Sequence, residues 1–515
     1  MPDAPTPRSV RPGAVLLHDA AAGFSVALML VPQAIAFAHV VGLPAHHGLW
    51  ASILPAIAAA FFASSPYLQT GPTAMTSLLT FGALSTVSAP GAPEYARYAA
   101  LLALMVGAVR IAFGVVGWGW IAYLVSQPVM SAFTSGAAVL IVLGQLPTVL
   151  GVAAPDSSVR SALWALSRPG AWNAVVIALS AITVAVVLGG RRLHVLFPGV
   201  LLAVVAGLVF NRLTGLGGAT LGVVSGALPP FDLSLPWYAS PQMLVPALTI
   251  ALVGFAEPTA IARTYAAQDR RPWDPDRELV SQGAACVAAA ISSGFPVGGS
   301  FSRTAVTRLA GARTRWAGAF AGLFTLAFLP AAPLIGELPR AVLSAIVIAA
   351  VMKVVAMREL VGLIRYSLPQ AIIGWLTFVL TLALSPRIDQ AIIVGLGFSV
   401  AVHLWREMPI RVRRSYAGTT LTLEPQGVLF FGSAPRLETA LLNQLAQHPE
   451  ARDLVLDLEE LGRIDFTGAL ALKTVIAEAE EAGLTAEVRH VPQHARRILA
   501  RVLPRHVEGA VGRPP

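Results

Sequence analysis

Long apolar runs, separated by short polar connections, fill most of the chain between residues 14 and 405. A membrane-spanning helix needs about 20 predominantly apolar residues, and runs close to this length recur throughout the region. They predict fourteen transmembrane helices, two of them short. The expected spans are 14–40, 45–63, 73–89, 95–116, 119–144, 171–190, 195–211, 241–263, 278–293, 300–313, 315–335, 340–357, 368–385 and 388–405.

The hydrophobic pattern changes near residue 408, where the long apolar runs stop. Short strand-like and helix-like segments alternate from there on, which predicts a small soluble α/β domain. The expected strands are 419–423, 428–431, 453–457 and 484–489, and the expected helices are 469–482 and 493–502. We therefore predict three parts: an N-terminal segment at 1–13, a transmembrane domain at 14–407, and the α/β domain with its tail at 408–515.

Composition and charge support an integral membrane protein. Hydrophobic residues make up 56% of the chain and charged residues 12%, against about 25% charged residues in soluble domains. The net charge of +9 does not indicate a nucleic-acid partner, because the basic residues are dispersed among apolar segments and lack an aromatic reading surface. They concentrate instead in alternate connections, the pattern of cytoplasmic loops, including Arg191, Arg192, Arg270, Arg271, Arg308 and Arg313. We therefore expect a multi-pass protein of the inner (plasma) membrane with both termini in the cytoplasm.

Two of the expected spans are preceded by Gly and Pro residues, at 71–72 and 296–299. A helix that begins inside the membrane presents unpaired N–H groups and partial positive charge to whatever lies in front of it, which suits an anion. The breaks precede the third and the tenth span, so each occupies the same place in a seven-span half. Because seven is odd, the second half inserts upside down, and the binding site of such transporters lies at the repeat interface. The alternative is that Gly and Pro merely kink ordinary spans.

Polar residues next to these breaks are candidates for chemistry. Ser300 suits the N-cap of the second half-helix and Pro72 the first helical position of the other. Arg303 would then lie in a first turn, where a cation opposes the helix dipole unless an anion is nearby; the alternative is that it snorkels toward the cytoplasm. Glu257 is the only carboxylate deep inside an expected span and is a candidate proton-coupling group, or else a static partner of Arg303.

Gln33 follows Pro32 in the first span, and Phe37 lies one helical turn further on the same face. Together they could offer an amide and a ring edge to a ligand. The alternative is an amide that closes the Pro32 kink and an aromatic ring in the core. The single cysteine, Cys286, excludes an intramolecular disulfide and a thiolate metal cluster, and we interpret it as a packing residue.

Several of these motifs, taken in order, resemble the sulfate permease (SulP) family of anion transporters: 31–37, 48–50, 64–75, Glu257, and the run from 277 through 294–296 to 302–304. The resemblance implies fourteen helices in two inverted seven-helix repeats, a core and a gate domain, and a homodimer. It also implies a substrate site at the third and tenth segments, with the first and eighth. The candidate substrate-binding residues are Gln33, Phe37, Thr73, Ala74, Ser300, Phe301, Ser302 and Arg303, with Glu257 as the ion-coupling residue.

The C-terminal pattern at 455–458 and 464–468 is similar to the STAS domain that follows the transporter in this family. Thr467 matches the position where soluble regulatory STAS proteins present a phosphorylatable hydroxyl. We expect it instead to cap the following helix. The chain lacks a Gly-rich phosphate loop, so neither nucleotide binding nor ATP hydrolysis by that route is expected.

These features favour proton-coupled symport of a carboxylate or oxyanion by alternating access, without a cofactor, a metal or enzymatic activity. The anion could be a dicarboxylate, sulfate or bicarbonate, and membrane lipid and a second copy are the expected partners. An anion channel or uncoupled exchanger is the main alternative. A sodium-coupled bicarbonate or nucleobase-type symporter is a further one.

Overall fold

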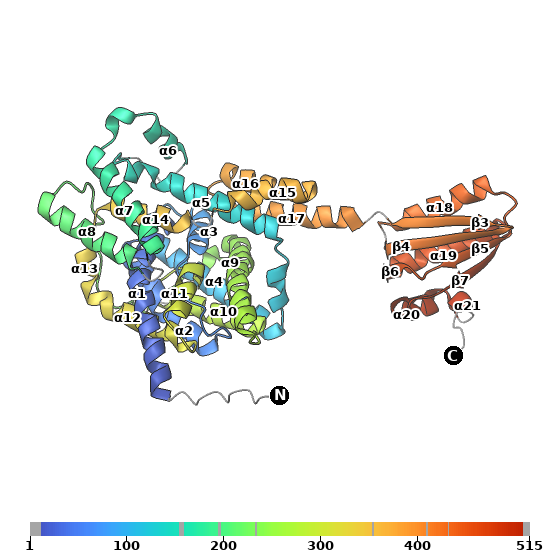
Figure 1. Ribbon diagram of the computed structural model, residues 1–515, viewed down its shortest axis with the longest axis horizontal. Coiled ribbons are helices and arrows are strands. Elements are labelled where there is room, and N and C mark those ends of the chain that lie inside the picture. The colour runs from blue at the N-terminus through green and yellow to red at the C-terminus, as the bar shows by residue number, and fades with distance from the viewer. Residues whose placement is uncertain are drawn as a thin grey trace. The chain divides into compact units, whose positions relative to one another are not determined.

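The computed structural model describes residues 12–153, 159–193, 197–231, 234–352, 355–407, 410–430 and 432–507. The predicted N-terminal segment up to residue 11 and the tail from residue 508 lie outside the described residues. Contacts divide the chain into two compact units, Met1–Leu396 and Gly397–Pro515, and each is described by itself (Figure 1).

The first unit is built from helices with little polar interruption. Seven described helices are long and apolar enough to cross a membrane, and five shorter apolar helices accompany them. The helices are α1 Pro12–Val41, α2 Ala45–Phe62, α3 Ala74–Leu84, α4 Tyr95–Val116, α5 Gln127–Val149, α6 Val159–Leu166, α7 Ala174–Leu193, α8 Gly199–Thr214, α9 Ser240–Asp269, α10 Pro275–Ile291, α11 Phe301–Leu309, α12 Trp316–Phe328, α13 Ala332–Ile335, α14 Arg340–Val351, α15 Met357–Tyr366, α16 Leu368–Ala383 and α17 Ile388–Glu407.

Leaving aside α6, α13 and α15, the described residues hold fourteen further helices: the twelve long or shorter apolar helices, together with α10 and the nine-residue α11. The first seven end with α8 and the second seven begin with α9, and in both sets a two-residue strand precedes the third helix: β1 Thr70–Gly71 and β2 Gly298–Gly299. The chain thus has the predicted fold, a polytopic α-helical membrane protein of two inverted seven-helix repeats. The expected span at 119–144 begins too early, because Gly119–Tyr123 is a 3₁₀ turn and α5 starts at Gln127, where Pro128 suits a helix start.

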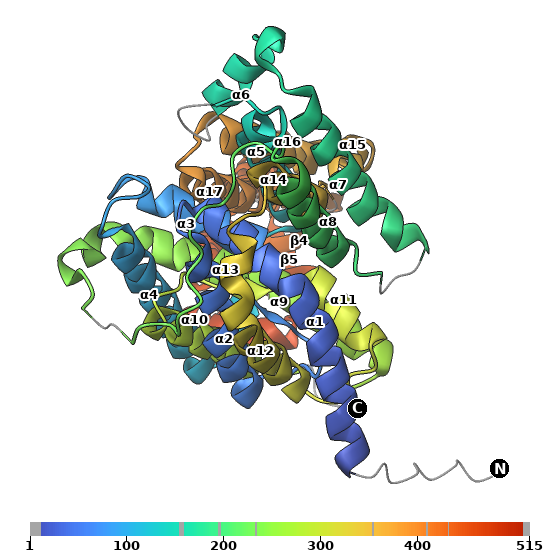
Figure 2. The same cartoon turned by 90° about the vertical axis from the view of Figure 1, so that its left-hand side faces the viewer.

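The helices of this unit pack in two groups, visible in Figures 1 and 2. The core group consists of α1–α4 with α9–α12, in which α10 packs on α4 and α2, and α12 packs on α1 and α2. The gate group contains α5, α7, α8, α14 and α16, with α14 against α5 and α7. Each of the two groups therefore draws helices from both repeats.

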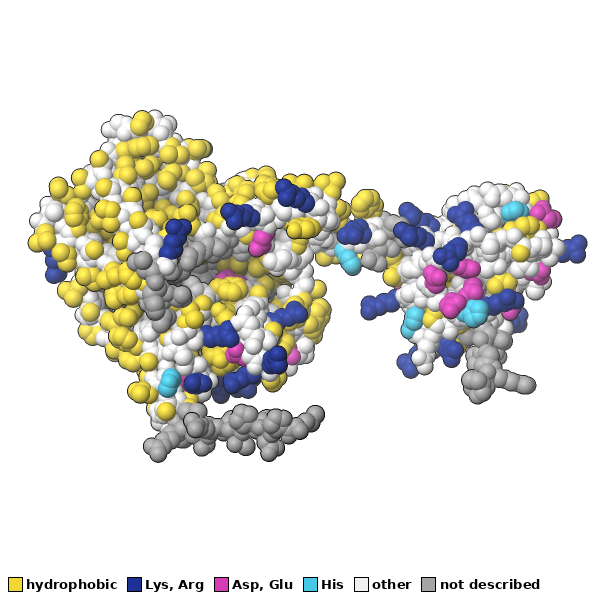
Figure 3. Space-filling view, in the orientation of Figure 1, with side chains coloured by type: hydrophobic (Ala, Val, Ile, Leu, Met, Phe, Trp, Pro, Cys, Tyr) yellow, Lys and Arg dark blue, Asp and Glu magenta, His cyan; other side chains and the backbone are white. Residues whose placement is uncertain are grey.

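Apolar side chains cover much of the visible face of the helical unit (Figure 3). On α8, for example, Leu202, Val205 and Val209 are each about half exposed. Exposed apolar stripes of this kind are unfavourable in water and suit contact with lipid.

The second unit is a small α/β fold with its own core. Its elements are β3 Arg411–Ala417, β4 Thr420–Leu429, α18 Ala434–Gln447, β5 Asp453–Asp457, β6 Leu461–Ile464, α19 Phe466–Glu481, β7 Thr485–Arg489, α20 Gln493–Val502 and α21 Pro504–Val507. The sheet order is β3-β4-β5-β7, with β6 paired to β4. β3 and β4 form an antiparallel hairpin, and β4, β5 and β7 are parallel. The two strands predicted at 419–423 and 428–431 are one continuous strand, β4, and β3, α18 and β6 were not predicted.

Candidate functional site

The two breaks meet at one point in the core group. β1 pairs antiparallel with β2, with Thr70 opposite Gly299 and Gly71 opposite Gly298. α3 begins at Ala74 and α11 at Phe301, directly after these strands. The sequence predicted both breaks, and the structure adds that they are hydrogen-bonded to each other. Both half-helix N-termini therefore start from the same two-stranded ribbon.

Side chains close the ribbon on both sides. The backbone N–H of Gln69 donates to Thr304 Oγ1 at 3.1 Å, and the N–H of Ser300 donates to the Gln69 carbonyl at 3.0 Å. Gln282 Nε2 of α10 donates to Thr70 Oγ1 at 2.7 Å. Each of these three hydrogen bonds joins the first repeat to the second. The two breaks are therefore held together as one rigid unit, in which most backbone N–H and C=O groups are paired.

The two half-helices begin differently. Thr73 is the N-cap of α3, and it forms a capping box with Thr76. The expectation that Pro72 takes the first helical position is therefore wrong: α3 begins at Ala74, and the hydroxyl of its N-cap Thr73 accepts from the Thr76 N–H at 3.3 Å. Ser300 is the N-cap of α11, as expected, but its side chain makes no cap hydrogen bond; its Oγ lies 3.3 Å from Ser302 Oγ. The N-terminal N–H groups of α11 consequently have no side-chain acceptor.

Arg303 lies in the first turn of α11 and is 1% exposed. It does not snorkel to the surface. Its Nη1 donates to the Pro72 carbonyl at 2.9 Å and lies 3.5 Å from Gln33 Oε1. Its Nε and Nη2 are buried and have no hydrogen-bond partner among the described residues. These two N–H groups share one edge of the guanidinium, the edge that receives carboxylates and other oxyanions through two parallel hydrogen bonds.

The other predicted site residues lie on α1 and at the starts of α3 and α11, and they differ in exposure. Gln33 and Phe37 are buried on α1, and Gln33 approaches Arg303. Ala74 and Phe301 are the first residues of α3 and α11. The Phe301 side chain is 48% exposed, whereas Ser300 is buried and Ser302 is half-buried. Of these side chains, Gln33 is the one with a described contact to Arg303.

Glu257 lies in the middle of α9, directly before Pro258, whose ring contacts the ribbon. A Cβ on Gly299 would approach the Pro258 ring to 3.1 Å. Glu257 interacts electrostatically with Arg303, yet no direct ion pair or hydrogen bond between the two side chains occurs in the described structure. The static-partner alternative therefore lacks a direct contact.

Two further carboxylates are buried, in α1 and α10, near the ends of the expected spans. Asp19 Oδ1 accepts from the backbone N–H of Arg313 and Thr314, and Glu278 Oε2 accepts from the N–H of Ser64 and Ser65. Both anchor connections near helix ends. Glu257 differs, because its carboxylate accepts no hydrogen bond from any described residue.

Arg110 of α4 is a second buried guanidinium, and the sequence analysis overlooked it. It is fully buried and donates to the carbonyls of Ile250, Ala251 and Val297 at 2.9–3.3 Å, and to Cys286 Sγ at 3.3 Å. No carboxylate pairs with it among the described residues. Arg110 therefore fixes α9 to the segment that leads into β2 and adds positive charge behind the ribbon. An arginine inside the expected span 95–116 was the available signal.

The chemistry of this arrangement favours an anion. Two buried guanidinium groups and two helix N-termini supply positive potential against one carboxylate that forms no direct ion pair. No cluster of metal-ligating side chains was found among the described residues of this region; the one candidate cluster, Asp457, Glu459 and His490, belongs to the second unit. The two free N–H groups of Arg303 are donors of the kind that a small ion with two acceptor oxygens requires.

In the second unit, the N-cap of α19 is Asp465, whose Oδ1 accepts from the Gly468 N–H at 2.7 Å. The expectation that Thr467 caps this helix is therefore wrong. Thr467 lies in the first turn with an exposed side chain, and its hydroxyl is 3.4 Å from Asp465 Oδ2.

Comparison with known proteins extends these observations. The sulfate permease family matches residues 16–377, and the STAS domain matches residues 412–502. A probable sulfate transporter of Mycobacterium tuberculosis is 33% identical over 364 residues, which cover 68% of this chain and 64% of the relative. The chain therefore spans less than two thirds of that relative's length. A sodium-independent sulfate anion transporter of Bos taurus is 27% identical over 512 residues, covering 91% of this chain and 83% of the relative.

Two solved structures share the fold. The murine solute carrier 26 family member A9 anion transporter, in its inward-facing state, superposes with a TM-score of 0.88 at 17% identity, over 96% of this chain and 88% of that one. The transmembrane domain of a cyanobacterium bicarbonate transporter superposes with a TM-score of 0.65 at 25% identity, over 75% of this chain and 97% of that one. With the family match covering most of the helical unit, the resemblance seen in the sequence is confirmed: the chain belongs to the sulfate permease family and carries a C-terminal STAS domain.

Proposed function

We propose that this protein is a secondary active anion transporter, not an enzyme, and that it moves a small carboxylate or oxyanion across the membrane by alternating access. The free Nε–Nη2 edge of Arg303 carries this proposal, because a buried, charged donor pair without a protein partner is costly unless a ligand completes it. Relatives described as sulfate transporters and as a bicarbonate transporter support the choice of anion class.

In this proposal the anion lies in front of α3 and α11. Arg303 donates hydrogen bonds to two oxygens of the anion, and the N-terminal N–H groups of α11 face the negative charge of the anion. Hydroxyl and amide donors complete the site, and Phe37 and Phe301 limit its size. The proposed binding residues are Gln33, Phe37, Thr73, Ala74, Ser300, Phe301, Ser302 and Arg303.

Glu257 is the proposed proton carrier. Its carboxylate lies in the field of Arg303 and has no hydrogen-bond donor among the described residues, so proton binding there does not require a structural bond to break. A carboxylate in the middle of a membrane helix is otherwise costly. Protonation of Glu257 would remove the negative charge that faces Arg303, and binding of the anion would supply a new one. Each event would thereby favour the other, which is the basis of coupling.

The orientation follows from the basic connections. Arg270 and Arg271 after α9 and Arg308 and Arg313 near the end of α11 belong to the same side as the N-terminus. We propose that this side is the cytoplasm, that the transmembrane domain extends over 14–407 in the inner membrane, and that the domain at 408–515 is cytoplasmic. A homodimer is the proposed assembly.

Uptake into proteoliposomes tests the function. Full-length protein is reconstituted, and radiolabelled sulfate, bicarbonate or succinate is offered with an inward proton gradient, an inward sodium gradient or neither. Proton-coupled symport predicts accumulation above the outside concentration only with the proton gradient. Accumulation driven by sodium alone would contradict proton coupling, and simple dissipation of the anion gradient would indicate the channel or uncoupled exchanger.

A further inference from the structure

A cavity separate from the Arg303 site lies between the core and gate groups, at the end of α1 remote from the N-terminus. Its volume is about 540 Å³, enough for a small anion together with many water molecules. Core helices α1 and α3 form one wall and gate helices α5 and α14 the other. None of the residues proposed above to bind the anion lines it.

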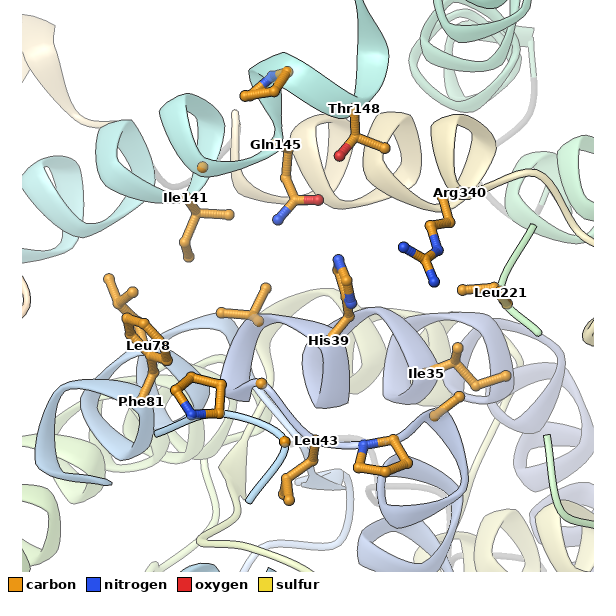
Figure 4. A pocket seen from close by; sticks show the side chains of 18 of the residues that line it. Ile35, His39, Leu43, Leu78, Phe81, Ile141, Gln145, Thr148, Leu221 and Arg340 are labelled. Carbon is orange, nitrogen blue, oxygen red and sulfur yellow. The ribbon is translucent and has the colours of Figure 1, made fainter. Parts of the chain in front are cut away.

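The polar side chains of both walls point into the same space (Figure 4). His39 rises from α1, Arg340 reaches in from the start of α14, and Gln145 and Thr148 descend from α5. Arg340 Nε donates to the Thr220 carbonyl at 2.8 Å, which holds the guanidinium in place. Its Nη1 and Nη2 have no partner among the described residues, so four N–H groups remain for a ligand.

Gln145 is oriented as a donor. Ser344 Oγ donates to its Oε1 at 2.7 Å, and the residue is buried. Because the oxygen is occupied, the amide N–H groups are the polar atoms that remain available to the cavity. A hydrogen-bond donor beside a guanidinium suits an acceptor-rich, negatively charged ligand.

No acidic residue lines the cavity. The nearest carboxylate along the chain from Arg340 is that of Glu337, which is paired with Arg212 at 2.5 Å. Arg340 is also the first residue of α14, where the helix dipole disfavours a cation unless an anion compensates it. The charge of Arg340 is therefore uncompensated by the protein on the side that faces the cavity.

We propose that this cavity is an outer capture site for a small inorganic anion, held by Arg340 with Gln145, Thr148 and His39 as hydrogen-bonding groups. The assignment to the outer side and to the transported ion rests on the proposed function. The anion-binding side chains come from both the core and the gate group, so the site exists only while the two groups are placed as they are here. The site concentrates anions before they reach Arg303.

Modification of an engineered cysteine tests the charge of the cavity without requiring transport. Cys286 is buried and serves as an unreactive background. Thr148→Cys is placed in the cavity, and Val223→Cys, which replaces a side chain that is 96% exposed, is the control outside it. Full-length protein in nanodiscs reacts with an anionic sulfonate or a cationic trimethylammonium methanethiosulfonate reagent of similar size. The measured quantity is the ratio of the anionic to the cationic rate.

We expect this ratio to be about tenfold higher at Thr148→Cys than at Val223→Cys, the size of effect that one nearby charge produces in a partly hydrated site. Adding Arg340→Gln should remove the difference. Adding Arg160→Gln, which deletes an exposed arginine outside the cavity lining and leaves the Arg212–Glu337 pair intact, should preserve it. Millimolar sulfate should slow the anionic reagent at Thr148→Cys and leave Val223→Cys unaffected.

Leu221→Cys, on another wall of the cavity, repeats the measurement if Thr148→Cys fails to fold. A ratio that Arg340→Gln leaves unchanged, or a cavity cysteine that neither sulfate nor chloride protects, overturns the proposal. The modification rates do not depend on uptake. If the wild-type protein transported no anion in proteoliposomes, the proposed function would fail, but the measured charge selectivity of the cavity would still hold.

Discussion

Replacing Arg303 by lysine separates the charge of this residue from its geometry. Lysine keeps a positive charge at the start of α11 but loses the planar fork. In the structure, Nη1 is committed to the Pro72 carbonyl, while Nε and Nη2 are free. An ammonium group in the same place has to divide its donors between Pro72 and the anion, and it cannot present two parallel N–H groups.

The expected loss follows from counting these bonds. A hydrogen bond that involves a charged group contributes about 1.5–3 kcal/mol, and Arg303→Lys removes one of the two that the free edge offers. Since about 1.4 kcal/mol corresponds to a factor of ten, the anion should bind roughly 10- to 150-fold more weakly. Arg303→Gln loses both bonds and the charge, and should cost about 3–6 kcal/mol, which abolishes measurable binding.

The assay is titration calorimetry of the full-length protein in nanodiscs with the anion that most stabilises the wild type in a thermal-shift screen. Arg308→Lys is the matched control, because Arg308 lies in the last turn of the same helix and pairs with Asp269 at 2.6 Å. Its affinity should equal that of the wild type. An Arg303→Lys protein that melts like the wild type and binds the anion equally well would refute the role given to the guanidinium edge.

Further predictions concern coupling, the ribbon and the second unit. Glu257→Gln should abolish proton-driven accumulation while preserving anion exchange, measured in the same proteoliposomes; acid-stimulated uptake that persists would remove this carboxyl from the mechanism. Gly299→Ala should lower the melting temperature and weaken anion binding, because its methyl group would meet Leu68 Cδ1 at 2.8 Å and the Pro258 ring at 3.1 Å; a wild-type melting curve and affinity would contradict the packing argument. Deleting the chain from β3 onward should leave calorimetric anion binding intact and change expression or transport rate; a folded product that binds no anion would show the site to be misplaced. The Asp457 carboxylate lies 2.8 Å from the His490 ring and raises the pKa of His490 above its ordinary value of 6.5. The pair should therefore contribute its full stabilisation below pH 6.5 and lose it as the pH rises through the folded-state pKa of His490. An NMR titration of His490 that is identical in Asp457→Asn would disprove the pairing.

The helical part of the fold could be predicted because its elements are encoded locally. Apolar runs of spanning length mark α1, α2 and α4 to within two residues, α9 extends six residues beyond its predicted end, and Gly and Pro mark the half-helices. The antiparallel pairing of β1 with β2 could not be predicted in this way, since Thr70–Gly71 and Gly298–Gly299 are two-residue strands with no pattern that specifies a partner. Long-range pairing of short strands is decided by tertiary packing.

The second unit shows the same contrast. β3 is mostly exposed and basic, so it has no alternating apolar face to detect. α18 did carry a signal, because its buried residues Leu437, Ala440, Leu441 and Gln444 repeat at helical spacing. The N-cap of α19 is Asp465, two residues before Thr467, because its carboxylate accepts from the Gly468 N–H and suits the positive end of the helix dipole.

At the candidate site, the sequence pointed to Arg303, Glu257 and Gln33 by their chemistry, since charged and amide groups are rare inside membrane helices; their roles stay predictions. It missed Arg110, although that residue lies in the middle of an expected span. Its contacts to Val297 and to two carbonyls of α9 exist only in the folded protein. Which nitrogens of Arg303 remain free is likewise a property of tertiary structure alone.

The ribbon of β1 and β2 has a mechanical consequence. It joins the two halves of the chain by backbone hydrogen bonds just before α3 and α11 begin. The N-terminus of one half-helix therefore cannot move away from the other unless these bonds break. An anion bound there would move together with a site of unchanged shape. Access to the site from either side of the membrane would then have to change by sliding of the other helices past it.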